Sequence, residues 1–189
     1  MRLRVLGPLD VVDDDARAVA LGGPKERRLL AALAVHLGEA VSEARLCDAL
    51  WGDDPPPSAT KTLRSYVSRL RKVLAASGDL RVESVESGYA LHPVRGAVDV
   101  HEVESLTGEA RDAVARGDLD AAANRYREAE RCWRGPVLGD LADAPFALSE
   151  VARLEELRLS LVGERLELDL ERERHAEVVG EREARTARF

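Results

Sequence analysis

Residues 55–72, PPPSATKTLRSYVSRLRK, carry five basic side chains and no acidic one, although the whole chain has a net charge of −7. Placed at about 100° per residue, the segment after the prolines separates into two faces. The apolar face holds Leu63, Val67, Leu70 and Leu74. A helix with this pattern needs neighbouring helices to cover one side and leaves the other side open to a partner.

The opposite face of this helix is basic and hydroxylic. It holds Lys61, Arg64, Ser65, Ser68 and Lys72, with Arg69 and Arg71 at its edges. Small serines at the centre allow a close approach to the floor of a DNA groove. Arginine can bond guanine through two hydrogen bonds, and lysine and hydroxyl groups hold phosphates. The alternative interpretation is a solvated helix face, but such faces usually mix charges and no acidic residue occurs between Pro55 and Gly78.

The elements around this helix favour DNA binding over a solvated face. We expect short strands at 2–7, 9–12 and 17–21, a helix from Pro24 to Leu37 that Gly38 ends, and a second helix capped by Ser42. The basic helix, capped by Ser58 or Thr60, comes third, and a hairpin follows with its turn near Glu86-Ser87-Gly88. This order predicts an α+β winged helix-turn-helix in residues 1–95, with the basic helix in the position that reads DNA.

Residues 96–189 predict a second, all-α domain. Helices at 100–118 and 119–134 meet at Gly117-Asp118 and resemble one tetratricopeptide-type helix pair. The small and aromatic residues of that pattern are Gly117, Ala121, Ala122, Tyr126 and Ala129. A long helix follows, and its expected apolar positions are Leu148, Val151, Leu154, Leu157, Leu161, Leu166 and Leu170.

Charge and composition support this division. Residues 1–95 hold 14 Lys/Arg and 13 Asp/Glu, whereas residues 96–189 hold 14 and 22, which suggests domains with different partners.

No segment of the sequence is typical of a membrane span or a signal peptide. The longest uncharged stretch, 29–38, is too short to cross a bilayer, and Pro8 and Asp10 interrupt the N-terminal apolar run. We therefore expect a soluble, cytoplasmic protein with no membrane partner.

Enzymatic and metal chemistry find little support in the sequence. LGGPKE lacks the spacing of a phosphate-binding loop, and the four histidines are scattered with no cysteine nearby. Cys47 and Cys132 lie in separate helical patterns, which indicates separate buried thiols. We expect no enzyme activity, no cofactor and no metal. The rival function is a helical scaffold whose basic helix contacts an acidic protein.

Four motifs carry a family resemblance: LGGPKERRLLAAL, LWGDDPPPSA, TLRSYVSRLRKVL and SGYAL, in this order. With the continuation DVHEVESLTGEA and GDLDAAANRYREAERCWRGPVLGDLAD, the chain resembles the Streptomyces antibiotic regulatory protein family. The resemblance implies an OmpR-type winged helix followed by a bacterial transcriptional activation domain. It also implies an activator of secondary metabolism that binds direct repeats in promoters, recruits RNA polymerase holoenzyme and forms a homodimer at least on DNA.

The resemblance assigns roles to residues of the basic helix and its surroundings. Ser65 and Arg69 would face base edges in the major groove. The residues that would hold phosphates or flank the reading face are Lys61, Thr62, Arg64, Ser68, Arg71 and Lys72. Trp51 would touch the DNA backbone or serve as a core aromatic. Tyr89 would anchor the wing, which is the hairpin with its turn near Glu86-Ser87-Gly88, or touch a phosphate.

Two departures from the family pattern stand out. The wing carries Val85 and Glu86 where members usually offer an arginine, so we expect no insertion into the minor groove. The chain ends in REARTARF where members continue with further helices, and we expect an activation domain cut short. The apolar residues that this would leave uncovered, and that dimerisation could cover, are Leu166, Leu170, Val178 and Val179.

Overall fold

The structure is a computed structural model that describes residues 1–76, 78–94 and 96–186, with side chains up to Glu173. The chain divides into two compact units. The first comprises Met1–Glu102 and Trp133–Glu155, and the second comprises Val103–Cys132 and Glu156–Phe189. The basic helix lies in the first unit.

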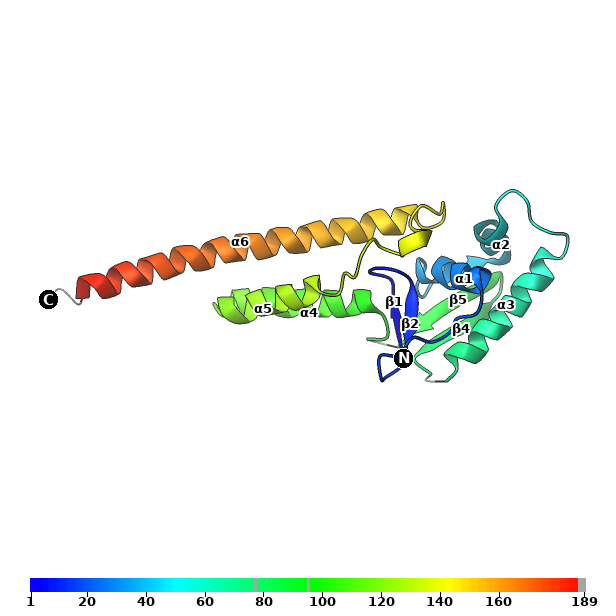
Figure 1. The fold of residues 1–189 in the computed structure, drawn as a ribbon, viewed down its shortest axis with the longest axis horizontal. Helices are drawn as coiled ribbons and strands as arrows, with labels where there is room; N and C mark the ends of the chain where they lie inside the picture. Colours follow the sequence, from blue (N-terminus) through cyan, green and yellow to red (C-terminus); the bar gives the residue numbers. More distant parts are fainter. Residues whose placement is uncertain (77, 95, 187–189) are drawn as a thin grey trace. The chain divides into compact units, whose positions relative to one another are not determined.

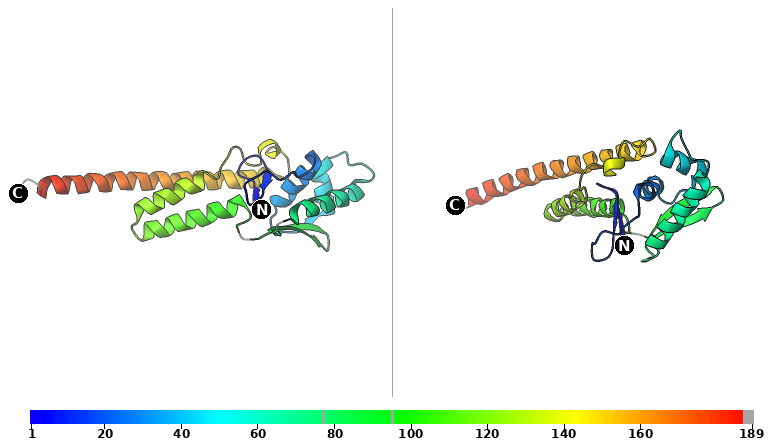
Figure 2. Two further views of the ribbon diagram at one scale, coloured as in Figure 1. Left: turned by 60° about the horizontal axis from the view of Figure 1, so that its bottom comes forward. Right: turned by 45° about the vertical axis from the view of Figure 1, so that its right-hand side comes forward.

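Three helices and a small sheet form the body of the first unit (Figures 1 and 2). The helices are α1 (Pro24–Ala34), α2 (Glu43–Trp51) and α3 (Ala59–Leu74). The sheet has the order β3–β5–β4, with β3 at Val41–Ser42, β4 at Leu80–Val85 and β5 at Gly88–Pro93, all antiparallel. This arrangement confirms the predicted winged helix-turn-helix, with the hairpin β4–β5 after α3.

The three helices bury the apolar stripes that the sequence predicts. Their side chains with at most 2% exposure include Leu29, Leu30, Leu33, Leu46, Leu50, Leu63, Val67, Leu70 and Leu74. Each buried leucine contributes about 1.5–3 kcal/mol of transfer free energy. Ser42 caps α2 as expected, because its side chain accepts a hydrogen bond from the Arg45 amide at 3.2 Å. Ser58 occupies the N-cap of α3 without a side-chain capping bond.

The two-residue strand β3 is an element that the sequence did not reveal. It pairs Val41 with Tyr89 and Ser42 with Gly88. A Cβ atom at Gly88 would lie 2.0 Å from the Val41 carbonyl oxygen, so only glycine allows this pairing. Because two residues are too few to produce an alternating hydropathy pattern, the sequence did not predict β3.

The N-terminal strands differ from the prediction. β1 (Arg2–Arg4) and β2 (Asp10–Val12) lie within the expected strands 2–7 and 9–12 and pair with each other, but residues 17–21 form only a single bridge, from Ala18 to Val12. The Asp13 carboxylate accepts hydrogen bonds from the amides of Asp15 and Arg17, and beyond this tight loop the Val19 amide still donates to the Val11 carbonyl at 2.8 Å. Helix α1 also ends earlier than predicted, at Ala34, because residues 35–38 turn so that the Gly38 amide donates to the Leu91 carbonyl of β5.

The first unit extends beyond residue 95. The Leu3 amide donates to the Ala97 carbonyl at 2.8 Å, and the amides of Val5 and Leu6 donate to the Asp99 carboxylate at 3.0 Å. Asp99 is only 4% exposed, and this burial raises its pKa above the ordinary value. A one-turn helix, η1 (Gly139–Leu141), lies in the later part of the same unit. The predicted functional boundary near residue 95 stays a prediction.

The second unit is built from three helices. They are α4 (Asp99–Ala115), α5 (Leu119–Glu130) and α6 (Leu148–Thr186), and the first residues of both α4 and α6 belong to the first unit. α4 and α5 form the predicted helix pair, joined where Gly117 adopts a positive φ of +76° and Asp118 caps α5 (Figure 2). The buried side chains of α5 are Ala122, Ala123, Tyr126 and Ala129, all at most 3% exposed.

The predicted apolar face of α6 is partly wrong. Leu154 and Leu161 are buried, and so is Leu168, which was not predicted. Leu148, Leu166 and Leu170 are 55%, 51% and 56% exposed, and for Leu166 and Leu170 this agrees with the expectation that they are left uncovered. The three buried leucines recur every seven residues, with Leu154 in the first unit and Leu161 and Leu168 in the second. The side chains of Val178 and Val179 lie outside the described residues.

Within the described residues, no helix combines the length and the apolar character needed to span a membrane.

Candidate nucleic-acid interface

Helix α3 presents its polar side chains on the face opposite its buried leucines. The exposed members are Lys61, Arg64, Ser65, Ser68, Arg69 and Lys72, and Thr62 and Arg71 are half-buried. Between Ala59 and Leu74 the helix has no acidic side chain. The structure therefore brings the predicted residues of α3 together on one amphipathic helix.

Each arginine of α3 is bonded to a different neighbouring element. Arg69 Nη1 donates to Glu26 Oε1 of α1 at 2.9 Å. Arg64 donates through Nε and Nη2 to Glu43 of α2 at 3.1 and 3.3 Å. Arg71 donates to the Val82 carbonyl and the Ser84 hydroxyl of β4 at 2.7 and 2.9 Å. The arginines thus connect α3 to α1, α2 and the hairpin.

These partners were missed by sequence reasoning. Glu26 and Glu43 lie 43 and 21 residues from the arginines they bind, so no helical spacing relates them. A local signal existed for Glu26 alone, because a glutamate three positions after the N-cap Gly23 is typical of a capping box. That signal predicts a helix start, not an arginine partner.

The two lysines of α3 differ from its arginines. Among the residues that the structure describes, neither the Lys61 nor the Lys72 ammonium group shows a hydrogen bond or ion pair. The hydroxyls bond locally: Ser65 Oγ donates to the Lys61 carbonyl at 3.2 Å, and the hydroxyls of Thr62 and Ser58 lie 3.4 Å apart. The lysines are therefore the most available cations on this face.

Glu43 links α3 to the wing electrostatically. The hydrogen bond from Arg64, which is 64% exposed, holds the pKa of the Glu43 carboxyl below its ordinary value. The Tyr89 hydroxyl also donates to Glu43, at 3.3 Å, and burial raises the pKa of this tyrosine. Glu43 is thus ionised near neutral pH and accepts hydrogen bonds from both α3 and β5.

Trp51 and Tyr89 both lie within the packed part of this region. The half-buried Trp51 ring stacks on Tyr66 with centroids 6.4 Å apart and planes inclined by 23°. Tyr89 is 7% exposed, and the guanidinium of Arg71 lies 5.7 Å from its ring. These positions favour the core role for Trp51 and the wing-anchor role for Tyr89, which were the alternatives to direct DNA contact.

The wing offers no cation at its tip. Glu86 and Ser87, both exposed, form the turn between β4 and β5. A cavity of about 320 Å³ lies beside it. Its lining residues are Glu43, Arg64, Ser84, Val85, Glu86, Ser87, Gly88 and Tyr89. With two carboxylates and one arginine, this cavity is a poor place for a phosphate.

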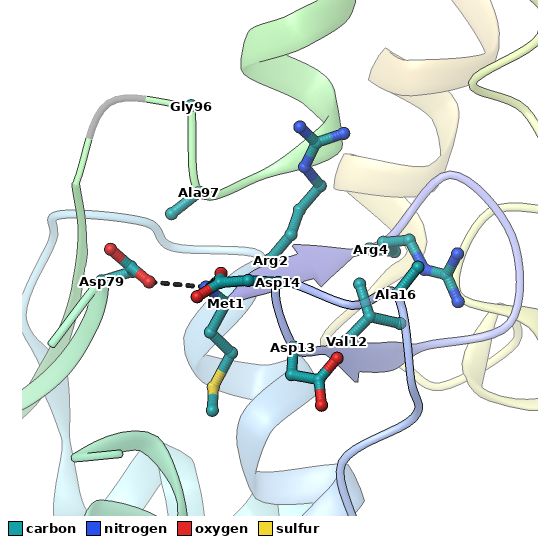
Figure 3. A pocket seen from close by; sticks show the side chains of 10 residues that line it. All are labelled: Met1, Arg2, Arg4, Val12, Asp13, Asp14, Ala16, Asp79, Gly96 and Ala97. Atoms are coloured by element: carbon teal, nitrogen blue, oxygen red, sulfur yellow. Dashed lines mark hydrogen bonds and ion pairs between the residues drawn. The ribbon is translucent and has the colours of Figure 1, made fainter. Parts of the chain in front are cut away.

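A larger cavity, of about 560 Å³, lies at the N-terminal strands of the first unit and not on α3 (Figure 3). The Met1 ammonium donates to Asp14 and Asp79 at 2.7 and 2.6 Å, which raises its pKa. Arg4 is bonded to Asp10. Most charges of this cavity therefore satisfy one another, and we assign it no ligand.

Within the described part of the chain, no cluster of His, Cys, Asp or Glu could hold a metal ion.

Comparison with known families matches both halves of the chain to transcription regulators. Residues 17–91 match the family described as transcriptional regulatory protein, C terminal. Residues 98–189 match the bacterial transcriptional activator domain.

Individual relatives are regulators as well. The chain is 37% identical to the regulatory protein DnrI of Streptomyces peucetius and spans 72% of that protein's length. It is 39% identical to the regulatory protein AfsR of Streptomyces griseus but spans only 19% of it. Both alignments cover at least 99% of this chain.

A solved structure shares the fold. Mycobacterium tuberculosis EmbR in complex with a low affinity phosphopeptide aligns with a TM-score of 0.81 and 32% identity. The alignment covers 98% of this chain and 49% of EmbR. Both family descriptions name transcriptional regulation, AfsR and DnrI are named regulatory proteins, and none of these names describes an enzyme.

Proposed function

Because the chain belongs to the Streptomyces antibiotic regulatory protein family, we propose that it binds promoter DNA sequence-specifically and activates transcription. The observation that carries this proposal is the exposed, carboxylate-free face of α3 between a helix pair and a hairpin. An α-helix fits the major groove of B-DNA, where all four base pairs can be distinguished.

The residues of this face differ in exposure and in whether their side chains already have bonding partners. We propose that Lys61, Lys72 and Arg64 hold phosphates and that Ser65 and Arg69 face base edges. Thr62 and Ser68 supply hydroxyls at the border of the reading face. Arg71, Trp51 and Tyr89 lie behind or beside it, and we propose that their main role is to hold the wing and α3 in place.

Residues 96–189 form the proposed activation region, and we propose RNA polymerase holoenzyme as its partner. Direct repeats in promoters would place two copies of the chain side by side, so we propose a homodimer at least on DNA. Regulation of secondary metabolism is the biological role that the DnrI and AfsR relatives support. The boundary between the DNA-binding and activation regions, near residue 95, is part of this proposal.

Selection of random duplexes by the purified chain tests the function. We expect one repeated sequence to be enriched, and a log–log salt slope of about −2.7 if Lys61, Arg64 and Lys72 each meet a phosphate. Lys61→Ala with Lys72→Ala should weaken binding to all duplexes and reduce that slope by about 2. No enrichment of any duplex would contradict the proposal and favour an acidic protein as the partner of α3.

A further inference from the structure

The Arg69 side chain is held on two sides yet stays open to a partner. Its Nη1 lies 2.9 Å from Glu26 Oε1, and its Cζ lies 5.7 Å from the centroid of the Tyr66 ring. The side chain is nevertheless 65% exposed. An arginine that is already fixed in orientation loses less conformational entropy when it meets a base than a flexible one does.

Glu26 is itself fixed in place. The residue is 6% exposed, and its Oε2 accepts a hydrogen bond from the Gly23 amide at 3.2 Å. A Cβ atom at Gly22 or Gly23 would lie 3.3 Å from the Glu26 side chain, so the two glycines leave room for this carboxylate. Glu26 also lies in the first turn of α1, where the helix dipole favours a negative charge.

Aromatic rings complete the support of Arg69. Tyr66, beneath Arg69, stacks on Trp51, and the Lys25 ammonium lies 5.7 Å from the Trp51 ring on α2. Lys25 also donates to the Leu50 carbonyl. Since Lys25 and Glu26 are neighbours in α1, the first turn of this helix contacts both ends of one continuous stack.

We propose that Glu26 is a positioning residue that fixes the Arg69 guanidinium for reading a base edge, with the guanine O6 and N7 atoms as its target. The inference rests on the proposed function. It separates the cations of α3 by mobility: Arg69 has a buried partner, whereas Lys61 and Lys72 have none among the described residues. Fixed donors suit base edges, and mobile charges suit phosphates.

Glu26→Gln tests this role without removing the helix start, because glutamine also fits the capping box. Binding would be measured for the duplex selected by the wild-type chain and for a scrambled duplex of the same composition. We expect the ratio of the two affinities to fall about tenfold, as for loss of one base-reading arginine. Affinity for the scrambled duplex should not fall, because the substitution removes a negative charge.

Glu86→Gln is the matched control. It makes the same change of charge at the exposed wing turn, where the described residues show no arginine bonded to Glu86, and it should leave the affinity ratio unchanged. Thermal unfolding of both variants would show whether either change acts through stability alone.

A double-mutant cycle with Arg69→Ala separates positioning from a structural role. If Glu26 acts through Arg69, Glu26→Gln should cause no further loss of discrimination once Arg69 is alanine. The proposal is overturned if Glu26→Gln keeps the wild-type ratio, or if Arg69→Ala does so while the wild-type chain still selects a sequence. A wild-type chain that selects no sequence would instead overturn the proposed function, and this inference with it.

Discussion

Two Arg–Glu–Tyr clusters, one in each unit, use the same three side-chain types. In the first unit, Glu43 accepts hydrogen bonds from Arg64 at 3.1 and 3.3 Å and from the Tyr89 hydroxyl at 3.3 Å. In the second unit, Glu164 accepts them from Arg111 at 2.9 and 2.6 Å and from the Tyr126 hydroxyl at 2.8 Å. The arginines are similarly exposed, at 64% and 60%, so the difference lies in the hydrogen-bond distances.

The shorter bonds belong to the cluster that joins three helices of one domain. Arg111, Tyr126 and Glu164 come from α4, α5 and α6, and Ser160 donates to Glu164 as well, at 3.4 Å. The longer bonds belong to Arg64, on the face proposed to meet DNA. Short charge-assisted hydrogen bonds are the stronger ones. We therefore expect the cluster of the second unit to be the more stable one, and we propose that a phosphate can replace the longer bonds of Arg64 in the first.

The largest expected effect is on stability, from Glu164→Gln. Loss of the charge-assisted bonds should lower the free energy of unfolding of the second unit by about 1–3 kcal/mol. Glu43→Gln should cost less, because its bonds are longer. Urea unfolding followed by circular dichroism would compare the two variants, and an equal or larger loss for Glu43→Gln would contradict the comparison.

The effect of Glu164→Gln on stability should also depend on pH. Arg111 is the main cause that lowers the pKa of Glu164 below its ordinary value of 4.5. A carboxylate with a lowered pKa stabilises the fold above the pKa of the unfolded state and loses this contribution as the pH falls through the folded value. The difference between wild type and Glu164→Gln should thus be constant near neutral pH and shrink below about pH 4.5.

The fold of the first unit could be predicted because its signals are local. Leucine spacing, the Ser42 cap and the hairpin turn each lie within a few residues, and the elements they indicate are present. β3 and the division into units could not be predicted, since they depend on contacts such as Gly88 with Val41 or Asp99 with Val5, far apart in the chain.

Helix α6 and the arginines of α3 show the limit of periodicity. Leu161 and Leu166 are equally apolar, but Leu161 is buried at 1% exposure whereas Leu166 is 51% exposed. The face of α3 was likewise visible in its helical pattern, whereas the partners of Arg64 and Arg69 were not. A sequence pattern shows which side chains share a face, and only the packed structure shows which of them already have partners.

Tyr126→Phe examines the second cluster at alkaline pH. Burial and the hydrogen bond to Glu164 raise the pKa of Tyr126 to about 12, from an ordinary value of 10.0. A group whose pKa is raised stabilises the fold below the unfolded value and loses this contribution as the pH rises through the folded one. Wild type should therefore lose stability between pH 10 and 12 that Tyr126→Phe does not lose, as measured by thermal unfolding. Parallel pH profiles for the two chains would contradict this assignment.

Glu86→Arg asks whether the wing beside the first cluster lies near DNA. Reversing this exposed charge should raise affinity for any duplex by roughly tenfold at low salt and make the salt slope steeper by about 1, if the new arginine reaches a phosphate. Filter binding or fluorescence anisotropy at several salt concentrations would measure both quantities. Unchanged affinity at low salt would place the wing away from DNA and leave α3 as the whole proposed interface.

The smallest expected effect, a change in DNA affinity, tests whether a phosphate can replace Glu43 as the partner of Arg64. Glu43→Gln should free Arg64 for a phosphate and raise affinity for all duplexes about two- to fourfold, with a salt slope steeper by up to about 0.9. Glu164→Gln, which makes the same change in the second unit, should leave DNA binding unchanged. The gain must also disappear when Arg64→Ala is added, because Arg64 is the group that Glu43 would release. If Glu43→Gln instead weakens binding, the carboxylate holds Arg64 in its binding position. The two clusters would then differ only in bond length and not in role.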